Sequence, residues 1–139
     1  MKKKDPIEEA RRYVDNAKNV LRDNTKVNPE TGLYEDPKYV RAAGNYLWLG
    51  VLTALDAVFH VKEEKKNKKG KGAHVSVNDY TAAIAKRDQK LLDWVDDGYV
   101  VMHLNMTYDG IRDKGVCMRG FSLANTIIDR CETLLPITA

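Results

Sequence analysis

The residue best suited to acid–base chemistry is His103, which lies in a short and otherwise apolar stretch at residues 99–108. Histidine is the side chain most often used as a general base near neutral pH. Asn105, Thr107 and Tyr108 follow it and offer further hydrogen-bonding groups. Because no nucleophile or second catalytic group accompanies His103 in a known pattern, a polar network inside the core is the favoured interpretation, and His103 is a catalytic candidate without an assigned reaction.

A second unusual residue is Asp56, which interrupts the most apolar segment of the chain. A buried carboxylate must be paired, hydrogen-bonded or protonated, since leaving it alone in an apolar environment is very unfavourable. Catalysis would explain it, but a tether to a neighbouring helix is favoured. The two most apolar helices of a bundle form its inner pair. We therefore expect one buried hydrogen-bond network that joins Asp56 to at least one of His103, Asn105, Thr107 and Tyr108.

A run of lysines at residues 62–74 is the most visible charged feature. Lysines in such a segment can contact nucleic-acid phosphates without sequence preference, and salt weakens the binding. The segment lacks arginine, interleaved aromatic residues and the pattern of a phosphate-binding loop. A flexible, solvated basic loop is therefore the favoured interpretation. The candidates for nucleic-acid contact are Lys65, Lys66, Lys68, Lys69 and Lys71.

The remaining histidines and the cysteines give no metal or cofactor signature. His60, His74 and His103 share no ligand spacing, and the chain has no CxxC, HExxH or glycine-rich nucleotide motif. Cys117 and Cys131 stand 14 residues apart in one expected helix, hence about 21 Å apart and beyond disulfide reach. We expect two buried thiols, no metal and no cofactor.

Helix-start signals position these residues. Asp5 with Pro6, and Asp36 with Pro37, place a capping acid before a proline, while Ser76 with Asp79 forms a capping box. Apolar residues then recur at helical spacing. In the first helix these are Ile7, Ala10, Val14, Ala17 and Leu21.

The second helix, residues 37–60, is apolar on almost every side over residues 47–59, which indicates a central helix. Gly44 and Gly50 mark close approaches to neighbouring helices. Residues 24–35 read as a loop, a break is expected at Gly98, and Pro136 ends a last helix at residues 115–135. No strand pattern is found. The prediction is one all-α domain over residues 1–139, an antiparallel up-and-down bundle of four to five helices.

The formal net charge of +3 comes from two segments. Lys2, Lys3 and Lys4 form a basic tail, and residues 62–72 hold six lysines against two glutamates. The rest of the chain carries 14 basic and 18 acidic residues. No apolar stretch follows the tail as a signal peptide requires, and none approaches the length of a membrane span. We expect a cytoplasmic protein that does not enter a membrane.

Four segments carry a family resemblance: DPIEEARRYVDNAKNVL, YVRAAGNYLWLGVLTALDAV, VMHLNMTYDG and LANTIIDRCETLL. With them, almost the whole chain resembles an uncharacterised bacterial family of short helical proteins, a domain of unknown function. The bundle of that family is similar to the HEPN class, which includes metal-independent ribonucleases, toxins and partners of nucleotidyltransferases. The resemblance implies a HEPN-like bundle and a dimer.

The nucleases of the HEPN class carry an arginine four to six residues before a histidine, and both face an RNA phosphate. Here the histidine on a suitable helix is His103, and the arginine positions hold Asp96, Asp97 and Gly98. Two carboxylates would repel a phosphate, so the nuclease motif is not intact.

The expected function is non-enzymatic: a helical binding or self-association module, most simply a homodimer. Tyr13, Tyr34 and Tyr39 are interface candidates, since tyrosine is enriched at interfaces. The alternative is an RNA-associated HEPN-like protein of the toxin–antitoxin type, or a nucleotidyltransferase partner, without nuclease activity.

Overall fold

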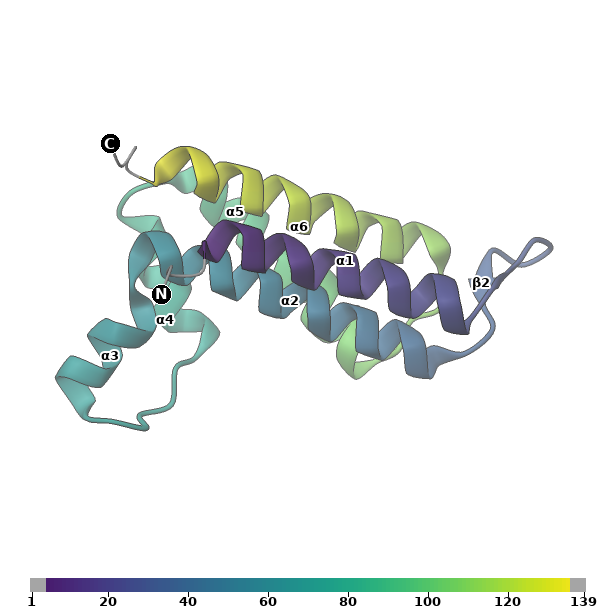
Figure 1. Cartoon of the computed structure of the whole chain (residues 1–139), viewed down its shortest axis with the longest axis horizontal. Helices are drawn as coiled ribbons and strands as arrows, with labels where there is room; N and C mark the ends of the chain where they lie inside the picture. Colours follow the sequence, from purple (N-terminus) through teal and green to yellow (C-terminus); the bar gives the residue numbers. More distant parts are fainter. Residues whose placement is uncertain (1–4, 136–139) are drawn as a thin grey trace.

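Four helical rods run side by side, antiparallel in sequence order, along the long axis of the molecule (Figure 1). The computed structural model describes residues 5–135. The rods are α1 (Pro6–Asn24), α2 (Pro37–Phe59), α5 (Gln89–Gly98) continued by the π-helix η1 (Tyr99–Tyr108), and α6 (Lys114–Leu134). The prediction of a mostly helical domain is confirmed. Within the described residues there are six α-helices and one π-helix instead of four or five helices.

Helix α2 lies at the centre and packs against α1, η1 and α6. Its Leu47, Val51 and Leu55 side chains are fully buried, as expected for a central helix. By length and composition α2 could also cross a membrane, contrary to the expectation from the sequence. In this structure 56% of its most apolar window is buried inside the bundle, and the core helix of a globular domain meets the same criteria.

Side-chain caps define where the helices begin. The carboxylates of Asp5 and Asp36 each accept a hydrogen bond of 2.9 Å from the amide two residues later, with proline at the first helical position. Ser76 and Asp79 form a capping box at the start of α4 (Val77–Ala85). Each cap satisfies amides that the helix itself leaves unpaired. The three predicted helix starts are confirmed.

A small β-hairpin joins α1 to α2, where the sequence predicts a plain loop. Strands β1 (Val27–Asn28) and β2 (Leu33–Tyr34) pair antiparallel. Gly32 closes the turn with a φ of 72°, a backbone conformation that glycine adopts without strain. Leu33 also bridges to Asp113, just before α6. The prediction of no strand is wrong because this long-range pairing stabilises strands too short to show an alternating pattern.

The lysine-rich segment is a helix over most of its length, α3 (Val61–Lys69), and only residues 70–76 lack regular structure. Val61 is buried, and Lys65 Nζ lies 3.2 Å from Asp79 Oδ2 of α4. Glutamates occupy the first turn of α3 and lysines the last, which suits the helix dipole. The predicted flexible loop over 62–74 is therefore wrong for residues 62–69.

The helix break that the sequence predicts at Gly98 is found before α5 instead. Gly98 has helical dihedrals, so α5 continues into η1 without a break. The interruption lies at residues 86–88 instead, where Asp88 caps α5 by accepting a hydrogen bond from the Leu91 amide at 3.1 Å. Apolar residues recur at helical spacing on both sides of residues 86–88, at Tyr80, Ile84, Leu91 and Val95, so the apolar pattern does not reveal this break.

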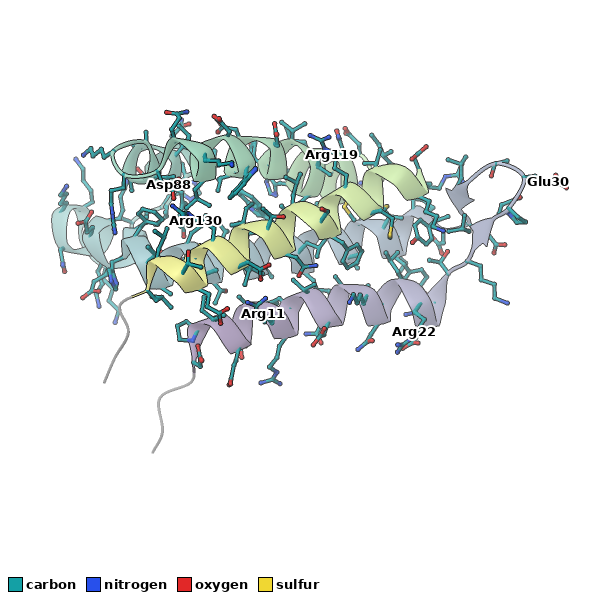
Figure 2. All side chains as sticks on the ribbon, turned by 90° about the horizontal axis from the view of Figure 1, so that it is seen from above. Arg11, Arg22, Glu30, Asp88, Arg119 and Arg130 are labelled. Atoms are coloured by element: carbon teal, nitrogen blue, oxygen red, sulfur yellow. The ribbon has the colours of Figure 1, made fainter. Side chains whose placement is uncertain are left out.

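Ion pairs tie α6 to two neighbours near its C-terminal end (Figure 2). Arg130 Nε contacts Asp88 Oδ2 at 2.8 Å, and the Asp88 side chain is only 7% exposed. Arg11 of α1 reaches Asp129 and Glu132 at 2.9 and 3.1 Å. This end of the α1–α6 seam is therefore closed by charged contacts.

Both cysteines point into the core from α6, as expected. Burial raises the pKa of the Cys117 thiol to about 11 and that of Cys131 to about 12, so neither forms a thiolate near neutral pH. The basic tail Lys2, Lys3 and Lys4, and the helix stop at Pro136, lie outside the described residues.

Candidate functional site

The π-helix η1 places three rings on one face. An α-helix turns about 100° per residue, so residues 99 and 108 would face opposite sides. A π-helix, with about 4.4 residues per turn, brings residues 99, 103 and 108 into line. Tyr99 stacks on His103 with ring centroids 5.2 Å apart, and Tyr108 meets the His103 ring edge-on at 5.1 Å. The rings form one continuous aromatic row.

Close packing against two glycines accompanies the π-helical turns. A Cβ atom on Gly44 of α2 would lie 2.5 Å from Met106 Cβ and 2.8 Å from the Met102 carbonyl oxygen. A Cβ on Gly120 of α6 would lie 2.8 Å from Met106 Sδ. Met102 and Met106 are fully buried. Only glycine lets α2 approach η1 this closely, which confirms the predicted role of Gly44. Gly50 likewise approaches the backbone of α1.

Helix α2 supplies the facing wall of a groove of about 500 Å³, called here the aromatic groove. Residues at positions i, i+3, i+4 and i+7 of a helix share a face, and positions 45, 48, 49 and 52 have this spacing. The chain before α4, with Tyr80, closes one end. The full lining is Asn45, Trp48, Leu49, Leu52, His74, Val75, Ser76, Val77, Tyr80, Tyr99, His103 and Tyr108.

The His103 ring is held by contacts with neighbouring aromatic rings. Its Nδ1 atom is buried and has no hydrogen-bond partner within residues 5–135. Burial lowers the pKa of the imidazole, so the ring is neutral at pH 7. Trp48 lies 6.0 Å from it, ring centroid to centroid. A general base needs a group that orients it, and a phosphate site needs a cation, yet none of the groove-lining residues is Asp, Glu, Lys or Arg. The geometry suits recognition of apolar and aromatic groups.

Asp56 is the interhelical tether that the sequence favours. Tyr80 of α4 donates a hydrogen bond of 2.7 Å to Asp56 Oδ2. The Lys62 amide donates to Asp56 Oδ1 at 3.1 Å, and Lys62 Nζ lies 3.7 Å from Oδ2. Burial and the Asp56 carboxylate raise the pKa of Tyr80. One carboxylate thus joins α2 to both α3 and α4.

The predicted network between Asp56 and the η1 residues is wrong. In the described part of the chain no hydrogen bond joins Asp56 to His103, Asn105, Thr107 or Tyr108. Thr107 Oγ1 donates instead to the Met102 carbonyl at 2.8 Å. The Asn105 carbonyl accepts from the Ile111 amide, and Arg41 donates to the carbonyls of Thr107 and Tyr108. The carbonyls near the C-terminal end of η1 are therefore paired with Arg41 and Ile111, because the last carbonyls of a helix have no partner within it.

The five candidate lysines divide by environment. Lys65 is half-buried and paired with Asp79, whereas Lys66, Lys68, Lys69 and Lys71 are exposed. Helix α3 projects from the end of the bundle (Figure 1) and carries the exposed Lys66, Lys68 and Lys69. They lie on a separate element from η1 and do not line the aromatic groove.

Sequence reasoning missed Trp48, Leu49 and Tyr99. The apolar run at 47–59 is expected to be buried on all sides, but Leu49 is 37% exposed. Tyr108, which is expected in a buried network, is 64% exposed. Conversely Tyr34, an expected interface residue, is buried, and Tyr13 and Tyr39 are half-buried.

No group of three or more His, Cys, Asp or Glu side chains within residues 5–135 could hold a metal ion.

Comparisons with known proteins match this architecture. A family model described as a domain of unknown function (DUF5618) matches residues 5–133. The chain is similar to a solved structure, a protein of unknown function from Dyadobacter fermentans, with 39% sequence identity and a TM-score of 0.78. That likeness covers 94% of this chain and 96% of the other. No curated protein matches the chain.

Proposed function

The chain belongs to the family described as a domain of unknown function (DUF5618), and we propose that it acts as a non-enzymatic binding module that pairs with a second copy of itself over the aromatic groove. The observation that carries this proposal is the composition of the lining. Charged residues make up 31% of the chain, yet none of the twelve lining residues is Asp, Glu, Lys or Arg. Depletion of charge with enrichment in aromatic residues is typical of the centre of an interface.

The shape of the groove supports self-association. Leu49 and Tyr108 are exposed large apolar side chains that belong to the lining itself. In a two-fold symmetric dimer the same patch meets itself, so each copy must offer both a hollow and a group to fill it. The groove offers the hollow between α2 and η1, and Tyr108 offers a flat ring with a polar tip. Burying such anchors contributes most of the binding free energy in typical interfaces.

The test compares two charge insertions at exposed apolar positions. Leu49→Glu places a carboxylate in the groove, whereas Val100→Glu places one on η1 outside the lining, at a residue that is 47% exposed. Analytical ultracentrifugation of the full chain should show a dimer for the native protein and for Val100→Glu, and a monomer for Leu49→Glu. A native protein that stays monomeric at millimolar concentration, or two variants that behave alike, would overturn the proposal.

A second candidate function is association with RNA as a HEPN-like protein of the bacterial cytoplasm. It is supported by the resemblance of four segments to a family whose bundle is similar to that class, and by the exposed Lys66, Lys68 and Lys69 of α3, a helix that projects from the bundle. Binding through these charges would weaken steeply with salt. Replacing them together with glutamine should flatten the salt dependence measured with a generic single-stranded RNA. Absence of binding at low salt would reject this candidate.

A further inference from the structure

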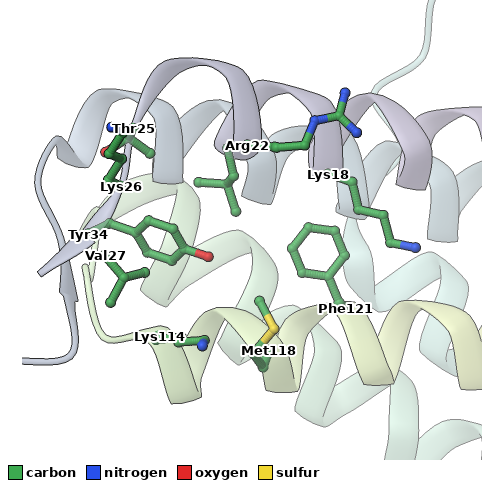
Figure 3. A pocket seen from close by; sticks show the side chains of 10 residues that line it. Lys18, Arg22, Thr25, Lys26, Val27, Tyr34, Lys114, Met118 and Phe121 are labelled. Carbon is green, nitrogen blue, oxygen red and sulfur yellow. The ribbon is translucent and has the colours of Figure 1, made fainter. Parts of the chain in front are cut away.

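The β-hairpin lies at the end of the bundle away from α3 (Figure 1), and a second hollow opens beside it. It has a volume of about 440 Å³ and opens between the last turns of α1, the hairpin and the first turns of α6. Figure 3 shows Phe121 and Tyr34 facing each other across it, with Met118 below. Its inner surface is therefore apolar, and its size falls in the range of small-molecule sites. It is called the cationic cavity because basic side chains form its rim.

Four basic side chains line this cavity: Lys18, Arg22, Lys26 and Lys114. No acidic residue belongs to the lining. Arg22 contacts the neighbouring Asp23 at 3.0 Å, outside the lining, while no carboxylate of residues 5–135 pairs with the three lysines. Without its lysine-rich segment and tail, the chain has more acidic than basic residues. Four cations around one hollow are therefore a higher local density of positive charge than the composition of the rest of the chain predicts.

The Tyr34 hydroxyl points into the middle of the cavity (Figure 3) and has no hydrogen-bond partner among the described residues. Burial raises the pKa of Tyr34, and the nearby Cys117 acts in the same direction, so the hydroxyl stays protonated and can donate. The Tyr34 ring itself is 8% exposed. A buried ring with a free donor at its tip is suited to hold an acceptor group of a ligand.

The frame around Tyr34 is fixed before any ligand binds. The Tyr34 amide donates to the Arg112 carbonyl at 2.8 Å, and Arg112 Nη1 donates back to the Tyr34 carbonyl at 3.3 Å. The Lys114 amide donates to the Gly32 carbonyl at 3.0 Å. These bonds hold the hairpin against the start of α6 and fix the walls of the cavity at this end of the bundle. At the opposite end, the ion pairs of Arg11 close the contact between α1 and α6. A preformed site avoids the entropy loss of ordering its walls.

We propose that the cationic cavity binds a small amphipathic acid as a free molecule: an apolar chain or ring that lies between Tyr34 and Phe121 and a carboxylate that meets the lysines of the rim. The charge of the rim matches the acid, the apolar floor matches the chain, and the Tyr34 hydroxyl supplies a directed hydrogen bond. This site goes beyond the proposed self-association, because it shares no residue with the aromatic groove.

Isothermal titration calorimetry on the full chain with three probes separates the contributions. Decanoate, which has both chain and charge, should bind saturably with one site per chain. Decanol, which has the chain without the charge, should bind at least tenfold more weakly, and acetate, which has the charge without the chain, should not bind. Equal affinities for decanoate and decanol, or uptake of many decanoates per chain, would overturn the proposal.

Paired variants then locate the site. The double variant Lys26→Gln/Lys114→Gln should bind decanoate at least tenfold more weakly. Lys66→Gln/Lys71→Gln removes the same charge from the opposite end of the molecule and should bind like the native chain. An equal loss in both doubles would show that net charge alone attracts the acid, and it would reject the site.

A substitution at Met118 keeps the test decisive if the lysine variants fold poorly. Met118 lines the cavity and is 42% exposed, so a polar side chain there does not enter the core. Met118→Glu should abolish decanoate binding through like-charge repulsion, whereas Met118→Gln, of the same shape, should retain it within threefold. Unchanged binding in Met118→Glu would contradict the placement of the acid.

Discussion

The aromatic groove and the cationic cavity are hollows of similar size, about 500 and 440 Å³, in one helical bundle. The groove lining has twelve residues and no formal charge, whereas the cavity lining has ten residues and four cations. The groove includes three rings that π-helical turns align, and the cavity lies where the hairpin packs against the start of α6. The two surfaces differ in composition, and we propose a different occupant for each: a second copy of the chain for the groove and a small acid for the cavity.

The largest effect is expected at Gly44, where α2 packs closely against η1. Gly44→Ala places a Cβ against the backbone of η1, which cannot yield, and should lower the free energy of unfolding by about 2–3 kcal/mol. Gly120→Ala meets the flexible tip of Met106, and alanine favours the helix, so it should lower stability by about 1 kcal/mol or less. Urea denaturation measures both. Equal losses would show that η1 yields as easily as a side chain.

The next effect concerns the tether at the end of the groove. Asp56→Ala removes the acceptor of the Tyr80 hydroxyl and of the Lys62 amide, and it should destabilise the fold by roughly 1–3 kcal/mol. A loss of that size would place Asp56 among the structural residues. Native stability in this variant would instead mean that the hydrogen bonds of Asp56 do not contribute to stability in solution.

Two tyrosine hydroxyls sharpen the comparison between the regions. Tyr80→Phe removes a hydroxyl bonded within the protein and should lower the free energy of unfolding by about 1 kcal/mol. Tyr34→Phe removes a hydroxyl without a partner among residues 5–135 and should change it by less than about 0.5 kcal/mol. Thermal and urea unfolding of the pair give the difference. A large loss in Tyr34→Phe would mean that its hydroxyl is used internally, which contradicts a donor kept for a ligand.

The smallest expected effect is a pH dependence of folding stability that arises from His103 in the aromatic groove. Burial lowers the pKa of His103, so the unfolded chain takes up its proton at a higher pH than the folded chain does. Stability should therefore fall as the pH drops below the usual histidine pKa of about 6.5, and level off below the folded value. His103→Phe keeps a ring in the row and should remove this slope. Denaturation between pH 7.5 and 5 tests it, and a slope unchanged in the variant would assign it to another group.

The sequence was sufficient for the features that depend on local chemistry. The caps at Asp5, Asp36 and Ser76, the central place of α2 and the tether role of Asp56 follow from residue type and spacing, and all are observed. Gly44 also indicates a point of close approach from the sequence alone, because a glycine inside a helix requires compensation by packing.

The rest depends on contacts between distant segments. The apolar residues of 99–108 fit an α-helix or a π-helix equally well. In the structure the π-helix packs closely against Gly44 and Gly120, contacts between distant segments that the local sequence does not encode. Without the π-helix, Tyr108 does not join Tyr99 and His103, so the groove could not be foreseen. The cationic cavity likewise depends on the pairing of Leu33 with Asp113 across the bundle.

The measurement that tests self-association over the aromatic groove most directly is a concentration series of nuclear magnetic resonance spectra of the native chain. From micromolar to millimolar protein, the ring signals of His103 and Tyr108 should change, whereas those of His60, an exposed histidine outside the lining, should stay constant. Changes confined to the groove would support a dimer that covers it. Signals of His103 and Tyr108 that stay constant over the whole range, or a dimer that shifts other residues instead, would contradict the account.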